Sequence, residues 1–150
     1  MLKGKLSTYK QYAWTAFANY IKARDRYKCI TCGIVAKGWD MNAGHWLPGR
    51  WNSILFEESC VHAQCVACNN SLGGNHPAYG RFMLGKYGQK EMDRLEKLWR
   101  KTVVYTKQDY KNIQLKYEEK LYETKRPVNI KKRPKARCSV VRITLVIRRT

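Results

Sequence analysis

The sequence predicts an α+β fold, in which a small zinc-stabilised core of two strands and a helix is flanked by an N-terminal helix and C-terminal helices. Two Cys-x2-Cys pairs, two β-prone segments between them and helical apolar spacing outside them lead to this prediction. A chain of 150 residues suits one small domain with an appendage. We place the domain at residues 1–125 and a basic C-terminal tail at residues 126–150.

The cysteine pairs are Cys29 with Cys32 and Cys65 with Cys68. Thiolates held two residues apart on a tight turn can both reach one Zn²⁺ at about 2.3 Å, and two such pairs close a tetrahedral structural site. The start of the chain lacks the apolar stretch of a secretory signal, so we expect a cytosolic protein, in which disulfides are disfavoured. Two disulfides or four unrelated buried thiols are the alternatives to zinc.

Helices are predicted on both sides of the cysteine-rich segment. Residues 8–27 carry an apolar helical face made of Tyr9, Tyr12, Ala13, Ala16, Phe17, Tyr20 and Ile21. Two further helices are predicted over residues 76–88 and 89–101. A last helix is predicted over residues 106–124, because the Thr-x-x-Asp sequence at its start is typical of an N-cap.

The segment between the cysteine pairs predicts a hairpin. Residues 39–47 and 59–63 are the two β-prone stretches, separated by a loop rich in Gly, Arg, Trp and Asn. The second cysteine pair then opens a helix near Val66, which the Gly73-Gly74-Asn75 turn ends.

The charge balance indicates a polyanion-binding protein, because 30 Lys and Arg stand against 11 Asp and Glu for a net charge of +19. Nucleic acid is the commonest polyanion. An anionic membrane surface is the alternative, but the sequence shows no long apolar span and no basic amphipathic anchor. The candidate DNA contacts are Arg50, Arg81, Lys86, Lys131, Lys132 and Arg133.

A zinc-clamped hairpin followed by a helix, with a histidine on its first strand, is the layout of a ββα-metal nuclease. Hydrolysis of a phosphodiester needs an activated water and a cation on the scissile phosphate. A neutral imidazole can take the proton from water near pH 7. Mg²⁺, or Mn²⁺ in its place, can stabilise the developing charge while it is held by few protein atoms. The candidate catalytic residues are His45, His62 and Asn69.

Each candidate has a structural alternative. His45 follows Gly44, which lets a phosphate approach closely; the imidazole is either the general base, a loop-stabilising group or a zinc ligand. His62 either binds Mg²⁺ or phosphate, or is a structural imidazole near the zinc. Asn69 either binds the metal or phosphate, or caps the following helix.

These residues resemble the bacteriophage NinG family of recombination proteins, also called Rap. The similarity runs from about Ala16 to Glu123. Its matching elements are Tyr20-Ile21-Lys22-Ala23-Arg24-Asp25, Cys29-x2-Cys32, Ala43-Gly44-His45, His62-Ala63-Gln64-Cys65-x2-Cys68-Asn69 and Gly74-Asn75.

The resemblance implies a DNA endonuclease of phage recombination that acts on branched DNA, such as Holliday junctions and D-loops, and is related to HNH nucleases. By this resemblance His45 matches the general base, the four paired cysteines match the zinc ligands, and Asn69 stands where HNH proteins place the last His or Asn. The protein would then be phage-encoded and act in the cytoplasm of the bacterial host. Two positions depart from the HNH pattern: Cys60 replaces its middle asparagine, and Gly44 replaces the Asp or His that often precedes the base.

We therefore predict a zinc-containing, HNH-like endonuclease that hydrolyses branched DNA with Mg²⁺ or Mn²⁺. The alternative is a zinc-ribbon DNA-binding accessory protein that positions recombination enzymes without cutting. Branched or double-stranded DNA is the expected partner, together with other phage recombination proteins. Paired cuts at a junction would call for a homodimer, although the sequence carries no decisive interface signal.

Overall fold

The computed structural model describes residues 3–126. Its elements in chain order are α1 (Leu6–Arg24), η1 (Gly38–Asp40), β1 (Met41–His45), α2 (Asn52–Leu55), β2 (Val61–Cys65), η2 (Ala67–Ser71), α3 (His76–Trp99) and α4 (Lys107–Lys125). The candidates Lys131, Lys132 and Arg133 lie outside the described residues, as does the rest of the predicted tail from residue 127. Within residues 3–126, no helix is both long and apolar enough to cross a membrane.

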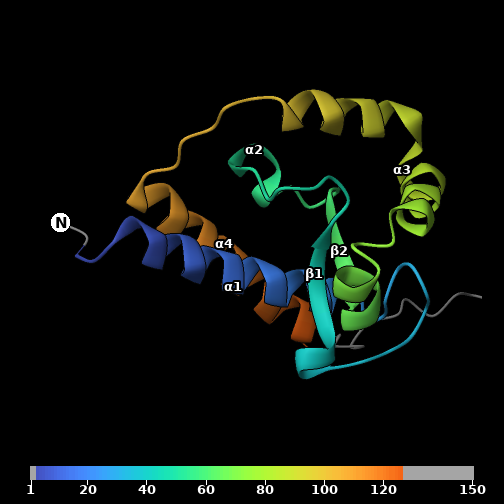
Figure 1. Ribbon diagram of the computed structural model, residues 1–150. Coiled ribbons are helices and arrows are strands. Elements are labelled where there is room, and N and C mark those ends of the chain that lie inside the picture. The colour runs from blue at the N-terminus through green and yellow to red at the C-terminus, as the bar shows by residue number, and fades with distance from the viewer. Residues whose placement is uncertain (1–2, 127–150) are drawn as a thin grey trace, which may run out of the picture.

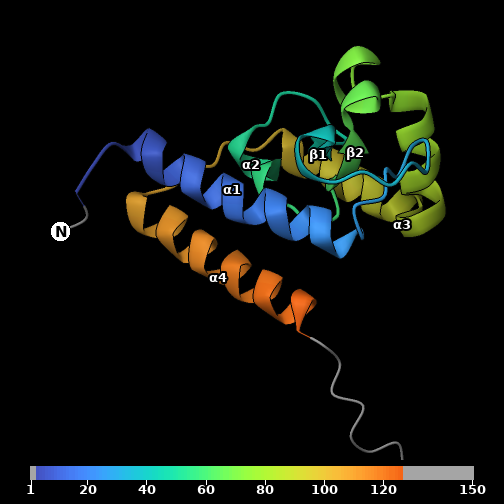
Figure 2. The same cartoon turned by 90° about the horizontal axis from the view of Figure 1, so that it is seen from below.

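Helices α1 and α4 lie side by side and run in the same direction (Figures 1 and 2). The buried side chains of α1 all belong to its predicted apolar face; they are Ala13, Ala16, Phe17 and Ile21. Phe17 meets Tyr117 of α4 edge to face, with 4.7 Å between the ring centroids. Buried aromatic pairs of this kind join the two helices into one layer.

The two strands form the predicted antiparallel hairpin, in which Gly44 lies opposite His62 and His45 lies opposite Val61. Strand β2 covers residues 61–65 instead of the predicted 59–63. The chain first turns, because the amide of Cys60 donates a hydrogen bond to the carbonyl of Glu57, and this turn delays the strand. Figure 1 shows the small sheet standing across the C-terminal half of α1.

The first cysteine pair lies on a tight turn, whereas the second pair links the end of β2 to η2. The amide of Cys29 donates to the carbonyl of Ile34, and the amide of Gly33 donates to the carbonyl of Cys29, each at 2.8 Å. Gly33 has a φ of 81°, which a side chain would disfavour. After the second pair, the helix predicted from Val66 is a single π-helical turn, η2.

The C-terminal helices follow the sequence prediction closely. The helix α3 runs from His76 to Trp99, but Gly88 has a φ of 76° and kinks it where the sequence predicts two helices to meet. The predicted N-cap of α4 is a full capping box, since the amide of Asp109 donates to Thr106 Oγ1 and the amide of Thr106 donates to Asp109 Oδ2.

An ion pair at the end of α1 ties this helix to the sheet. Arg24 Nε donates to Asp25 Oδ1 at 2.8 Å, and its two terminal nitrogens reach the carbonyls of Glu58 and Val61, also at 2.8 Å. Asp25 Oδ2 accepts a hydrogen bond from the amide of Ala63 in β2. The pair therefore fixes where β2 stands relative to α1.

We expect Arg24→Met to lower the free energy of unfolding by about 3 kcal/mol, because it leaves the largely buried Asp25 carboxylate without its partner. The matched control is Arg94→Met. Arg94 pairs with Glu57 and Glu91, but its side chain is 48% exposed, so this change should cost less than about 1 kcal/mol. Urea unfolding of both variants measures the difference, and equal losses would refute the anchoring role of Arg24.

Candidate metal centre and catalytic pocket

The four paired cysteines come together at one point. The sulfur atoms of Cys29, Cys32, Cys65 and Cys68 all lie within 4.8 Å of one another. Cys32 Sγ and Cys65 Sγ are 3.7 Å apart, which is close to the ~3.8 Å between sulfurs that tetrahedral bonds of about 2.3 Å to zinc require. The four thiols can therefore hold a metal ion such as zinc.

Local hydrogen bonds prepare one of these thiols for metal binding. Burial alone opposes ionisation of Cys29, but the Thr31 hydroxyl and backbone amides bond to its sulfur and lower its pKa, whereas the pKa values of the neighbouring Cys32 and Cys65 thiols are raised. A metal binds the thiolate form, so a low pKa favours binding near neutral pH.

Beside the cysteines lies a pocket of about 470 Å³, which we call the His45 pocket. It is formed by α1, η1, β1, the loop after β1, and η2. Its lining residues are Trp14, Ala18, Lys22, Gly38, Trp39, Met41, Asn42, Ala43, Gly44, His45, Arg50, Asn69 and Asn70. The structure thus brings two of the three predicted catalytic residues, His45 and Asn69, into one pocket.

His45 is held in a fixed orientation and keeps one nitrogen available. Its ring stacks on Trp14 at 5.4 Å between centroids, with 16° between the planes. Burial first, and then the charge of Arg50, lower the pKa of His45 to about 4, against a hydrogen bond to the backbone of Leu55. Nε2 is buried and finds no hydrogen-bond partner among residues 3–126. A neutral imidazole with a free acceptor nitrogen can take a proton.

Two amide oxygens crowd the Cα of Gly44. A Cβ at this position would stand 2.1 Å from Gln64 Oε1 and 2.7 Å from Asn69 Oδ1, so only glycine fits without a rearrangement. Gln64 is fully buried, and its Nε2 donates to the carbonyl of Gly74 at 2.8 Å. Its Oε1 has no hydrogen-bond partner within the described chain. The two amide oxygens therefore meet at Gly44, and of the two residues Asn69 also lines the His45 pocket.

His62 is not part of this pocket, contrary to the sequence prediction that it binds Mg²⁺ or phosphate. It is fully buried, and its ring nitrogens bond to the hydroxyls of Tyr79 and Tyr87 at 3.1 and 2.9 Å. Burial lowers the pKa of His62 to about 3, with a further contribution from Arg24. With both nitrogens engaged and no charge, this histidine is a structural imidazole of the core.

The family model described as "Bacteriophage Lambda NinG protein" matches residues 2–127. The chain belongs to the NinG family. It is 32% identical over 105 residues to protein ninG of Escherichia phage 933W, Escherichia phage lambda and Salmonella phage P22, and each match covers 68% of this chain. The chain spans about half the length of these curated relatives, 51%, 50% and 50% respectively. No solved structure matches it.

Cys60 of this NinG-family chain lies in the main core and does not belong to the cysteine cluster. It is fully buried in the main core, and burial raises the pKa of its thiol to about 11. Its carbonyl accepts hydrogen bonds from the Trp46 amide and the Tyr79 hydroxyl. The thiol is therefore protonated at neutral pH and acts as an apolar core group.

The predicted DNA contacts divide between the pocket and the outer surface. Arg50 lines the His45 pocket, with its guanidinium carbon 4.1 Å from the centre of the Trp14 ring. Arg81 and Lys86 lie exposed on α3, outside this pocket, and Lys86 stands over the rings of Phe82 and Tyr87.

Sequence reasoning missed several pocket residues that the NinG-family fold gathers around His45. Trp14, Ala18 and Lys22 follow one another at four-residue spacing and form a stripe along α1, next to its apolar face. That stripe was a usable signal, because a tryptophan and a lysine at this spacing share one side of a helix. The role of Gln64 carried no such signal, because only the hairpin register turns its side chain toward Gly44.

We expect about one zinc per chain in the purified protein, and loss of the folded state in Cys29→Ser or Cys68→Ser, since small zinc-dependent modules unfold without metal. Cys60→Ala is the matched control, because it removes a buried thiol outside the cluster and should keep the zinc. Elemental analysis and thermal unfolding check both expectations. A metal-free wild type with an ordinary unfolding transition would refute the metal centre.

Proposed function

We propose that this NinG-family protein is a metal-dependent, HNH-like endonuclease of phage recombination, which cleaves branched DNA in the cytoplasm of the bacterial host. One observation carries the proposal: the His45 pocket brings the amide of Asn69 and the cations Lys22 and Arg50 together with His45, whose buried Nε2 has no hydrogen-bond partner among residues 3–126. Such convergent polar groups in one pocket are typical of a catalytic site.

His45 is the general base in this proposal. Its Nε2 would accept a proton from the attacking water, and the stack on Trp14 keeps the ring in place while it does so. Because the pKa of His45 is lowered to about 4, the imidazole is neutral at the pH of the host cytoplasm.

The oxygens beside Gly44 fit a divalent cation. Mg²⁺ and Mn²⁺ prefer oxygen ligands, and Mg²⁺ is commonly held by one or two protein groups together with waters and substrate phosphates. Asn69 Oδ1, which lines the pocket, would hold it here, with the buried Gln64 Oε1 as a second oxygen behind Gly44. When bound, the cation would stabilise the negative charge that develops on the scissile phosphate.

Two cations of the pocket would bind the DNA backbone. Lys22 enters from α1 and Arg50 from the loop after β1. Arg50 is stacked on Trp14, which fixes its guanidinium and reduces the entropy lost on binding a phosphate. Together with the excess of basic residues over the whole chain, these groups would position a strand with its phosphate facing His45.

We expect His45→Ala to slow cleavage of a four-way junction by about 100- to 10,000-fold, the usual contribution of a general base. DNA affinity and zinc content should stay near the wild-type values, because the cations and cysteines remain. His76→Ala is the matched control, since His76 is an exposed histidine outside the pocket. Gel-based cleavage and fluorescence anisotropy measure the two effects.

The pH dependence gives the same test a second readout. Cleavage by the wild type should be constant above about pH 5 and should fall at lower pH, as His45 becomes protonated through its pKa of about 4. Equal cleavage by wild type and His45→Ala would remove this residue from the mechanism. Tight binding without cleavage by either protein would favour the DNA-binding accessory role instead.

Gly44→Ala should raise the Mg²⁺ concentration needed for half-maximal cleavage by about tenfold or more, because its Cβ displaces both amide oxygens; disturbing groups around a bound metal typically costs about 10- to 100-fold in affinity. Gly85→Ala is the matched control, since nothing lies within 4 Å of a Cβ at that position. Zinc content measured in both variants separates this effect from damage to the cysteine cluster. An unchanged Mg²⁺ requirement in Gly44→Ala would place the cation elsewhere.

A further inference from the structure

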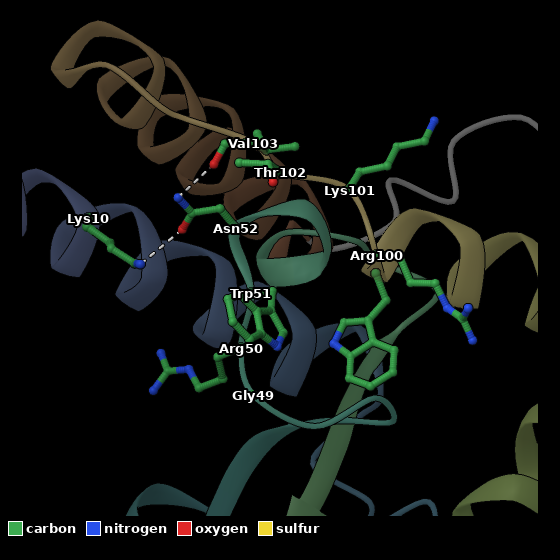
Figure 3. Close-up of a pocket in the computed structure, with 10 residues that line it drawn as sticks. Lys10, Gly49, Arg50, Trp51, Asn52, Arg100, Lys101, Thr102 and Val103 are labelled. Atoms are coloured by element: carbon green, nitrogen blue, oxygen red, sulfur yellow. Dashed lines mark hydrogen bonds between the residues drawn. The ribbon is translucent and has the colours of Figure 1, made fainter.

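A second cavity, of about 580 Å³, lies next to the His45 pocket, and we call it the Trp51 cavity. Figure 3 shows that α1, the segment leading into α2 and the segment after α3 surround it. Among its lining residues are Lys10, Arg50, Trp51, Asn52, Trp99 and Lys101. A volume of this size is typical of sites for small ligands.

Hydrogen bonds between distant segments hold the Trp51 cavity in shape. Lys10 Nζ donates to Asn52 Oδ1 at 3.0 Å, and Asn52 Nδ2 donates to the carbonyl of Val103 at 3.1 Å (Figure 3). The hydroxyl of Ser53, which is buried, donates to the carbonyl of Trp99 at 3.3 Å. Three parts of the chain are thereby linked around the opening, so the cavity exists before any ligand arrives.

The charges of the Trp51 cavity suit a phosphate backbone. Lys10, Arg50, Arg100 and Lys101 line it, and none of its ten described lining residues is acidic. Lysine and arginine at the rim of a concave site bind phosphates by charge-assisted hydrogen bonds.

The two indole rings of the cavity suit a nucleobase. Trp51 is 61% exposed, and its ring lies against the backbone of Gly49, where a Cβ would approach Trp51 Nε1 to 2.6 Å. Trp99 Nε1 is buried and has no hydrogen-bond partner in the described part of the chain. An exposed indole face offers stacking, and an unpaired N–H donor matches the ring nitrogens and carbonyl oxygens of a base.

Arg50 joins the Trp51 cavity to the His45 pocket, because it lines both. A single strand that places one phosphate at His45 can therefore continue past Arg50 and bring a neighbouring nucleotide to Trp51. The base of a fully paired duplex cannot enter without being unstacked, whereas an already unpaired base enters at little cost.

We propose that the Trp51 cavity binds one unpaired nucleotide of the DNA strand whose phosphate lies in the His45 pocket. This inference rests on the proposed function, since it takes DNA as the substrate. It assigns the preference for branched DNA to a named site: stacking on Trp51, a hydrogen bond from Trp99 Nε1, and phosphate contacts from Arg50 and Lys101.

The test compares two DNA probes that differ by one nucleotide, a paired duplex and the same duplex with a single unpaired thymidine. The protein carries His45→Ala in every measurement, so that binding is measured without cleavage. Adding Trp51→Ala should weaken binding to the probe with the unpaired nucleotide by about tenfold, the usual effect of removing a base-stacking aromatic. Binding to the paired duplex should change less than about twofold, since stacking on Trp51 requires an unpaired base.

Three controls separate stacking from general effects. Tyr122→Ala removes an exposed aromatic ring on α4, outside both pockets, and should leave the affinity for both probes unchanged. Trp99→Phe keeps an aromatic ring but loses the donor, and should weaken binding to the unpaired probe by about fivefold. Lys101→Ala should weaken binding to both probes. It should also reduce the slope of log affinity against log salt concentration by about 1, the value for one lost phosphate contact.

The outcomes distinguish this inference from the proposed function. Equal effects of Trp51→Ala on both probes, or no effect on either, would overturn the nucleotide site. The proposed nuclease activity would not be affected by this result, because the cleavage assays of the wild type test it separately. Free thymidine monophosphate that competed as well as the unpaired probe would overturn the assignment to a DNA strand. Loss of the preference for the unpaired probe in Trp51→Ala, together with tight DNA binding but no cleavage by the wild type, would support the nucleotide site and refute the nuclease.

Discussion

The cluster of four cysteines is the constraint on which the candidate site depends. It joins the turn at Cys29 and Cys32 to the end of β2 and to η2, and the buried side chains of Met41 and Ala63 pack with the cysteines. Cys65 is the last residue of β2, and Cys68 lies in η2 next to Asn69. The cysteine cluster therefore fixes the position of the strand and of Asn69 together. A metal bound there would add its binding free energy to the stability of the folded state.

The hairpin register then decides which groups meet. Gly44 pairs with His62, so Gln64 is its diagonal neighbour on β2. The side chain of Gln64 therefore reaches the space that a side chain on residue 44 would occupy. Its amide oxygen stands in that space. Positions 44 and 64 must therefore be understood together.

Much of this fold could be predicted from the sequence, because the signals were local. Apolar spacing predicted α1, the Thr-x-x-Asp sequence predicted the start of α4, and Gly88 marked the break in α3. The spacing within the two Cys-x2-Cys pairs predicted the cysteine cluster, and the two β-prone stretches between the pairs predicted the hairpin. The pocket itself could be predicted only in part, since the roles of Trp14, Gln64 and Trp51 depend on contacts between segments that no local pattern reports.

The two histidines of the hairpin show why residue type and position alone do not define a role. His45 and His62 lie on paired strands, and burial lowers the pKa of both, to about 4 and about 3. A lowered pKa therefore does not distinguish base from core residue. What differs is the hydrogen bonding: two tyrosine hydroxyls use both nitrogens of His62, whereas His45 Nε2 has no partner within residues 3–126. A buried acceptor without a donor lowers the stability of the folded state. A water or a protonated group of a bound substrate that donated to His45 Nε2 would offset this cost, as is typical of functional sites.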